Sequence, residues 1–359
     1  MRRLAAAAIA AATLVITACG HPFVPAADSQ AGSKPASKPA SKPAPGVTTT
    51  RPLTTGVDLY ITRDYSLAET EALGRRSIAW IAGTLRVQAI GIAWDLSVPH
   101  DTSDVVLARG PVTPSVADIR ALTLIAHAYH LRVEYRVLFQ VAGTDGATES
   151  LRPASQPVWI ASLLSAETAY LKLAAREKVG EFIVGTELAN LEGSAEWPAF
   201  YRQASSIYPG LLSGASWGGN FFSPHGILPP VADYGVTAYP DVNLPASATV
   251  AQLTAAWTSF LDQVPASVLR RTAIDEIGIP AEVGAYAHPW AWNNQHGLQD
   301  DQVQARWFEA ACAAAVAAHM RGIFFWNVNL VDDPQHPFAS LVKFEARPAS
   351  EAAIRNCGR

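Results

Sequence analysis

Eight short apolar segments, separated by segments of helical period, constrain this sequence more than any other feature. The predicted strands cover residues 56–62, 87–96, 132–141, 181–188, 210–217, 233–240, 270–280 and 321–329. The predicted helices cover residues 66–83, 113–130, 158–177, 196–208, 250–264, 301–320 and 350–356. Apolar strands without strict alternation, interleaved with helices, are typical of a parallel sheet covered by helices.

Eight strand–helix units are what a (β/α)8 barrel requires, and the chain from Thr54 onward has a suitable length. The alternative is a doubly wound open sheet, which usually has a Gly-rich turn after its first strand. Here the first strand continues into Thr62, Arg63 and Asp64 without such a turn. The sequence therefore predicts an α/β protein with a single (β/α)8 barrel over residues 54–359.

Two acidic residues stand at the ends of predicted strands, where barrels of this kind have their active sites. Glu187 ends the buried fourth strand, and burying a charge within a strand is costly, so we place it at the mouth of the barrel. Asp275 and Glu276 are adjacent on the seventh strand, and side chains alternate along a strand. We therefore expect Glu276 to point into the mouth and Asp275 to be structural.

A pair of carboxylates facing each other across a barrel mouth suits glycoside hydrolysis. One carboxyl donates a proton to the leaving oxygen, and the other stays ionised to attack the anomeric carbon. A separation of about 5 to 5.5 Å would indicate a retaining reaction, and a wider gap an inverting one.

Aromatic and amide side chains at other strand ends and in the following loops are expected to bind sugar. These candidates are Trp94, Trp217, Asn220, Tyr239, Trp290, Trp292 and Trp326. For Trp94, Trp217 and Trp326 the alternative is core packing, whereas Trp290 and Trp292 lie in a polar loop.

Three short motifs resemble a known family. VGTEL at 184–188, IDEIGIP at 274–280 and FFWNVN at 324–329 are similar to glycoside hydrolase family 113 of clan A, which is known for β-mannanase activity. The resemblance extends through the barrel in strand order.

This resemblance implies roles for individual residues. Glu187 would be the acid/base and Glu276 the nucleophile. Tyr239 would hydrogen-bond the nucleophile, and Trp326 would form the floor of the sugar subsite nearest the cleaved bond. Thr186 takes the place at which most of the clan has an Asn that binds the sugar 2-hydroxyl.

The N-terminus carries an export signal. Arg2 and Arg3 precede an apolar segment, 4–16, that is too short to span a bilayer comfortably, and ITACG follows with Cys19. This pattern resembles a bacterial lipobox, which implies cleavage before Cys19 and attachment of lipid to its sulfur. The alternative is an ordinary signal peptide with a chance Cys.

A Lys- and Pro-rich repeat, SKPASKPASKPAP at 33–45, cannot form a core and predicts an extended tether. We therefore divide the chain into a signal peptide (1–18), a lipidated tether (19–53) and the barrel (54–359). This organisation predicts an exported protein anchored through Cys19 to the outer face of the bacterial cell membrane.

Two cysteines remain, Cys312 and Cys357, and outside the cell two thiols usually pair. Their pairing stays open at this point. No Cys/His cluster has zinc-ligand spacing, and the chemistry requires no cofactor or metal. The net charge of −4 and the absence of a basic run argue against nucleic acid as a partner. We expect a monomer.

The sequence thus predicts a retaining glycoside hydrolase that acts on a β-linked polysaccharide or oligosaccharide, with mannan-type chains as the best single guess. One alternative is a non-catalytic carbohydrate-binding lipoprotein on a degenerate barrel, which would bind sugar without turnover. Another is an esterase or amidase, but the sequence has no G-x-S-x-G elbow.

Overall fold

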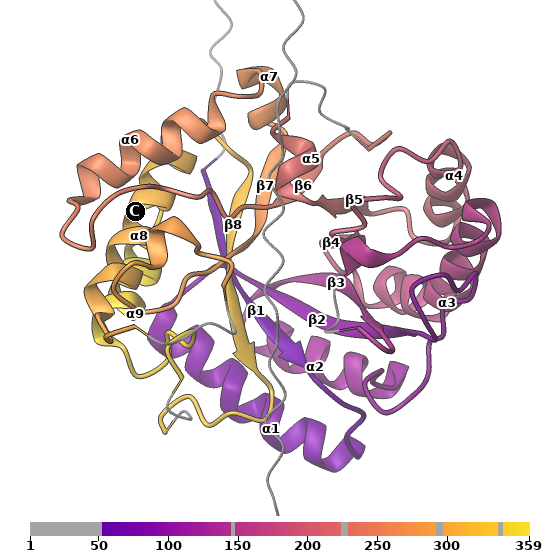
Figure 1. The fold of residues 1–359 in the computed structure, drawn as a ribbon. Helices are drawn as coiled ribbons and strands as arrows, with labels where there is room; N and C mark the ends of the chain where they lie inside the picture. The colour runs from indigo at the N-terminus through magenta and orange to yellow at the C-terminus, as the bar shows by residue number, and fades with distance from the viewer. Residues whose placement is uncertain (1–51, 145–147, 224–228, 292–296, 337–339) are drawn as a thin grey trace, which may run out of the picture. The chain divides into compact units, whose positions relative to one another are not determined.

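The structure is a computed structural model that describes residues 52–144, 148–223, 229–291, 297–336 and 340–359. Eight parallel strands close into a barrel in chain order (Figure 1), which confirms the predicted (β/α)8 TIM barrel. The strands are β1 (Thr54–Ile61), β2 (Ala89–Val98), β3 (Arg132–Val141), β4 (Glu181–Thr186), β5 (Leu211–Ser216), β6 (Tyr234–Thr237), β7 (Thr272–Ile277) and β8 (Gly322–Asn329). The predicted signal peptide, most of the tether and Cys19 lie outside the described residues.

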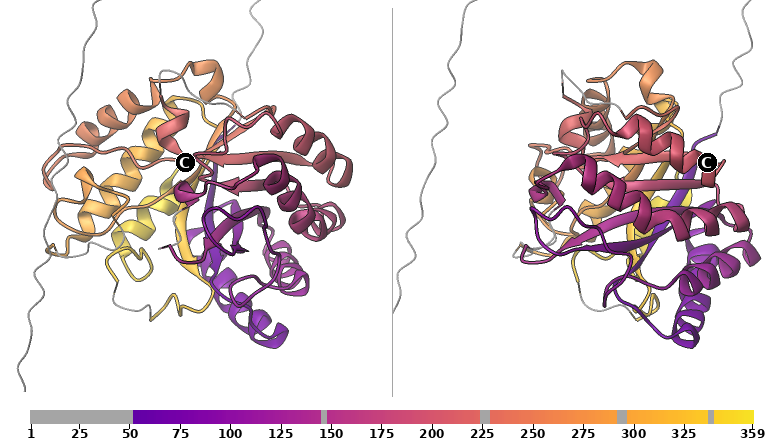
Figure 2. Two further views of the ribbon diagram at one scale, coloured as in Figure 1. Left: turned by 45° about the vertical axis from the view of Figure 1, so that its right-hand side comes forward. Right: turned by 90° about the vertical axis from the view of Figure 1, so that its right-hand side faces the viewer.

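Helices surround the strands on the outside of the barrel, as Figures 1 and 2 show. They are α1 (Leu67–Trp80), α2 (Val116–Ala128), α3 (Gln156–Glu177), α4 (Trp197–Ile207), α5 (Gly218–Phe221), α6 (Val250–Leu261), α7 (Ala266–Leu269), α8 (Asp301–Ala317) and α9 (Pro348–Asn356). The described residues also form a π-helix, η1 (Ile81–Leu85), and the 3-10 helices η2 (Thr148–Ser150) and η3 (Ala285–Ala287). Within the described ranges, none of the helices has the length and apolarity that crossing a bilayer requires.

Capping boxes fix where several helices begin. At the start of α1 the Glu69 N–H donates to the Ser66 hydroxyl, and the Ser66 N–H donates to the Glu69 carboxylate at 3.0 Å. The same reciprocal pattern joins Thr249 to Gln252 at the start of α6. Local sequence therefore determines where α6 begins. One face of this helix lines the cleft that is described below.

The outward faces of the strands pack beneath the helices. Trp94 on β2 is fully buried, with its ring centroid 4.9 Å from Tyr170 on α3 and 5.4 Å from Tyr135 on β3. This corrects the prediction that Trp94 binds sugar, because a side chain enclosed between the barrel wall and a helix cannot reach a ligand.

A buried ion pair ties together the N-terminal ends of the strands. The Arg321 guanidinium, just before β8, donates two hydrogen bonds of 2.7 and 2.9 Å to the Glu181 carboxylate on β4. Ser213 on β5 donates a third to Glu181 at 2.6 Å. Removing one partner of such a buried pair leaves an uncompensated charge and costs about 3 to 5 kcal/mol.

A disulfide joins Cys312 on α8 to Cys357 after α9, with 5.6 Å between their Cα atoms. This is the pair that the sequence left open. The bridge attaches the C-terminal helix to the body of the barrel.

Candidate active site

A cleft of about 1160 Å³ opens at the C-terminal ends of β4 to β7. Both predicted acids, Glu187 and Glu276, line it, together with Tyr239, Trp217 and Trp290. The strand ends therefore bring residues far apart in the sequence to one site, as a barrel requires.

Glu187 takes an unusual backbone conformation directly after β4. Its φ is 56°, in the left-handed region that residues other than Gly rarely adopt, and its N–H donates to the Ala215 carbonyl at 2.9 Å. Such a conformation costs about 1 to 3 kcal/mol and clusters at functional sites. The turn directs the Glu187 carboxylate into the cleft, where the Thr237 hydroxyl donates to it at 2.7 Å.

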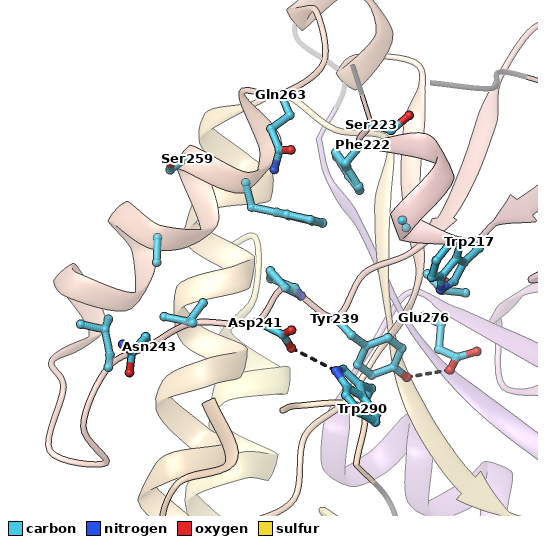
Figure 3. Close-up of a pocket in the computed structure, with 18 of the residues that line it drawn as sticks. Trp217, Phe222, Ser223, Tyr239, Asp241, Asn243, Ser259, Gln263, Glu276 and Trp290 are labelled. Carbon is cyan, nitrogen blue, oxygen red and sulfur yellow. Dashed lines mark hydrogen bonds between the residues drawn. The ribbon is translucent and has the colours of Figure 1, made fainter. Parts of the chain in front are cut away.

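Glu276 is nearly buried, with 8% of its surface exposed. The Tyr239 hydroxyl donates to its Oε1 at 2.6 Å, and Figure 3 shows this bond at the edge of the cleft. On the other side, Nη1 of Arg136 lies 3.5 Å from Oε2. Burial raises the pKa of Glu276, while the Arg136 charge and the Tyr239 hydrogen bond act to lower it. These two neighbours stabilise the ionised carboxylate that burial alone would disfavour.

Thr237 connects the two acids. It pairs with Glu276 between β6 and β7, after a register shift that begins beyond Val236, and its hydroxyl contacts Glu187. The Tyr239 hydroxyl is influenced by both acids: after burial, the charges of Glu276 and then Glu187 contribute to raising its pKa. Two carboxyl groups therefore share one polar corner of the cleft.

Arg136 is the important residue that the sequence reading missed. It is fully buried inside the barrel on β3, with Nη1 3.2 Å from Oδ2 of Asp58 on β1. Gly91 on β2 leaves room for the Asp58 carboxylate, because a Cβ there would collide with it. The signal was present: charges at 132, 134 and 136 alternate with apolar residues, and in a barrel covered by helices the charged face must turn inward.

A second polar cluster occupies the strand ends of β1, β2 and β8. The Tyr60 hydroxyl donates to Asp95 at 2.5 Å, and its ring centroid lies 5.2 Å from that of Trp326, which is half-buried. Burial raises the pKa of Asp95 to about 6, although the Tyr60 hydrogen bond opposes the rise. Alternation along β2 thus directs Asp95 toward Tyr60, while its neighbour Trp94 packs against α3.

The other predicted sugar contacts divide into two groups. Trp217 and Trp290 are 43% and 52% exposed and line the cleft, and the Trp290 indole donates to Asp241 at 3.0 Å (Figure 3). Thr186 is 3% exposed and is not in the wall of this cleft. Trp292 lies outside the described residues.

The structure does not place Asn220 where the predicted sugar contact requires it. Its amide donates to the Glu192 carboxylate and to the Ala189 carbonyl, both at 2.8 Å, so it supports a loop instead of lining the cleft. Glu192 also accepts the Trp217 N–H at 2.6 Å. Burial raises the pKa of Glu192 to about 7, against the effect of these hydrogen bonds. Asn220 and the backbone of Trp217 therefore share one acceptor, Glu192.

Within the part of the chain that the structure describes, no group of three or more His, Cys, Asp or Glu side chains is arranged to hold a metal ion. The two acids at the cleft have hydrogen-bond donors and a guanidinium as neighbours.

Comparison with protein families matches residues 74–337 to the family described as Glycoside Hydrolase Family 113. Comparison with curated proteins found no match.

Several solved structures share the fold. The β-mannanase of family 113 from Alicyclobacillus acidocaldarius, in complex with ManMIm, has a TM-score of 0.70 at 19% identity, covering 84% of this chain and 97% of that chain. A second family 113 β-1,4-mannanase has a TM-score of 0.73 at 14% identity, covering 86% and 98%. A family 5 lichenase from Caldicellulosiruptor sp. F32 has a TM-score of 0.53 at 13% identity, covering 90% and 99%.

Proposed function

Because this chain belongs to Glycoside Hydrolase Family 113 and is a glycoside hydrolase, we propose that it cleaves a β-linked, mannan-type polysaccharide or oligosaccharide by a retaining double displacement. The observation that carries the mechanism is that Glu187 and Glu276 line one cleft, with Thr237 contacting one and pairing with the other. The β-mannanases among the family's solved structures support the substrate class.

In the first step, the ionised Glu276 carboxylate attacks the anomeric carbon while Glu187 gives its proton to the departing glycosidic oxygen. The Arg136 charge and the Tyr239 hydroxyl favour the ionised nucleophile. The product of this step is a glycosyl ester on Glu276 and a released alcohol.

In the second step, Glu187 takes a proton from water, and the water oxygen attacks the same carbon from the face that the leaving group left. The bond to Glu276 breaks, its carboxylate reforms, and the sugar leaves with its original anomeric configuration. Trp326 presents a flat apolar face beside Tyr60 and Asp95, which suits the ring of the sugar under attack.

A screen of aryl β-glycosides and neutral polysaccharides tests the activity. We expect wild-type turnover and loss of turnover in Glu276→Ala. Azide added to Glu276→Ala should restore cleavage of an activated aryl glycoside and give the α-glycosyl azide, because azide then attacks from the face of the missing nucleophile. Undiminished turnover by Glu276→Ala would overturn the assignment.

Glu187→Ala distinguishes the acid/base from the nucleophile. A leaving group that needs no proton should still depart, so a reactive aryl glycoside is consumed while polysaccharide is not. Azide should here give the β-glycosyl azide. Binding of glycans by the wild type without turnover of any would instead favour the non-catalytic carbohydrate-binding protein.

For localisation, we propose that residues 1–18 direct export and that Cys19 carries a lipid. The lipobox-like ITACG and the Lys- and Pro-rich repeat support this. Incorporation of a labelled fatty acid in the wild type but not in Cys19→Ala would agree with it, and equal labelling would contradict it.

A further inference from the structure

The cleft extends to one side of the two acids. From Glu187 and Glu276 its wall continues past the ends of β5 and β6 and reaches α6. Figure 3 shows Asn243, Ser259 and Gln263 along this extension, well away from Glu276. We call this extension the α6 groove; its α6 wall consists of Gln252, Ala256, Ser259 and Phe260, continued by Gln263 just after the helix ends.

The four helix positions form a single face. Their spacing of four, three and one residues follows the helical period. The opposite positions, Leu253, Trp257 and Leu261, are buried, and Trp257 lies 5.0 Å from Trp307 on α8 between ring centroids. Because α6 is held on α8 by its apolar face, its other face is a fixed wall.

The second wall of the groove comes from the residues that flank α5, with Trp217 before this helix and Phe222 and Ser223 after it. Phe222 and Phe260 meet at 4.1 Å between ring centroids. This contact brings the two walls together in an apolar strip.

The chemistry of the α6 groove suits an uncharged, hydroxyl-rich chain. Ser259 and Gln263 are exposed and offer a hydroxyl and an amide that both donate and accept hydrogen bonds. Exposed Gln252 adds amide N–H donors, while its oxygen caps α6, and the α6 wall carries no charge. Exposed Trp217 adds an aromatic face of the kind that packs on sugar rings. An anionic or cationic ligand would find no complementary charge along α6.

The position of the groove decides which part of the chain it holds. Both acids, Glu187 and Glu276, line the inner end of the groove, whereas Tyr60, Asp95 and Trp326 belong to the cluster at β1, β2 and β8 and are not in its wall. Since the sugar under attack is proposed to lie on that cluster, the departing part of the substrate extends from the acids in the other direction, into the groove.

Resting on the proposed function, we propose that the α6 groove binds the leaving-group part of a neutral polysaccharide, on the reducing-end side of the cleaved bond. The enzyme then binds several sugar units of the polysaccharide on that side. A short aryl leaving group does not contact the groove, so the groove adds nothing to its binding.

Ser259→Trp tests this proposal by filling the groove from an exposed helix position. Thr258→Trp is the matched control, because Thr258 is exposed on the same helix but does not line the groove. Each variant is compared with wild type on a mannan polysaccharide and on an aryl β-mannoside. Gln263→Ala, which removes only an amide, serves as a milder second variant.

We expect Ser259→Trp to lower kcat/KM on polysaccharide by about tenfold or more, equivalent to about 1.4 kcal/mol, with the aryl glycoside and Thr258→Trp nearly unchanged. Gln263→Ala should give a smaller loss of the same kind. Equal losses on both substrates, or no loss on polysaccharide, would overturn the proposal.

Wild type without turnover on either substrate would be a failure of the proposed function, which is distinct from a failure of the groove. In that case affinity electrophoresis through gels containing neutral polysaccharides decides. Retardation of wild type and Thr258→Trp, but not of Ser259→Trp, would support the groove, and equal mobility of all three would overturn it.

Discussion

Replacing Tyr239 by Phe removes one hydroxyl from the site and keeps the ring. That hydroxyl donates to Oε1 of Glu276 at 2.6 Å, and this hydrogen bond acts to lower the pKa of Glu276. Without it, burial raises the pKa of the nucleophile further and only the Arg136 charge opposes the rise.

The size of the effect follows from the kind of bond. A hydrogen bond to a charged group contributes roughly 1.5 to 3 kcal/mol, and about 1.36 kcal/mol changes a rate tenfold. Tyr239→Phe should therefore lower kcat/KM by between about tenfold and about 150-fold. The loss should be greatest at low pH, because a smaller fraction of Glu276 is ionised there.

The assay is the pH dependence of kcat/KM on an aryl glycoside, whose acidic limb reports the free enzyme's nucleophile. In Tyr239→Phe the acidic limb should move to higher pH. Tyr208→Phe is a matched control, because the Tyr208 hydroxyl is buried against the Val179 carbonyl before β4. An acidic limb that stays in place, or moves to lower pH, would refute the reasoning.

Two further predictions concern stability. Cys312→Ser removes a disulfide with a sequence separation of 45 residues, so the free energy of unfolding should fall by roughly 4 kcal/mol from the loss of chain entropy constraint. Urea unfolding of the wild type with and without reductant measures this change. A wild-type unfolding curve that reductant does not shift would contradict the prediction. Burial raises the pKa of Glu192 from 4.5 to about 7. Between these two pH values, the Glu192 carboxyl is protonated in the folded protein and ionised in the unfolded chain. Wild-type stability should therefore fall as pH rises from about 4.5 through about 7. Glu192→Gln should flatten this slope, and an identical slope in both proteins would show that Glu192 does not titrate there.

Much of the fold was predictable because it depends on local pattern. The alternation of apolar strands and helical segments predicted the barrel, and the helix predicted from residue 66 begins there in the structure, with Ser66 as the N-cap of α1. The two acids were found because charges at the ends of buried strands are costly unless they lie at a mouth.

The predictions that failed depended on the direction in which a single side chain points. Trp94 and Asp95 are adjacent, and the alternation argument that we applied to Asp275 and Glu276 would have turned Asp95 inward and Trp94 outward. Asn220 looked like a ligand because it follows a strand, yet its amide is held by Glu192.

By itself the sequence determined the number of strand–helix units, the position of Glu187 and Glu276 at strand ends, and the spacing of amides and rings along α6. Only the tertiary structure decided that Arg136 supports Glu276, that Thr237 links the two acids, and that α6 forms a wall of the cleft. The reason is physical: these contacts join strands and helices far apart in the chain, and register shifts such as that between β6 and β7 break the two-residue period on which sequence reasoning depends.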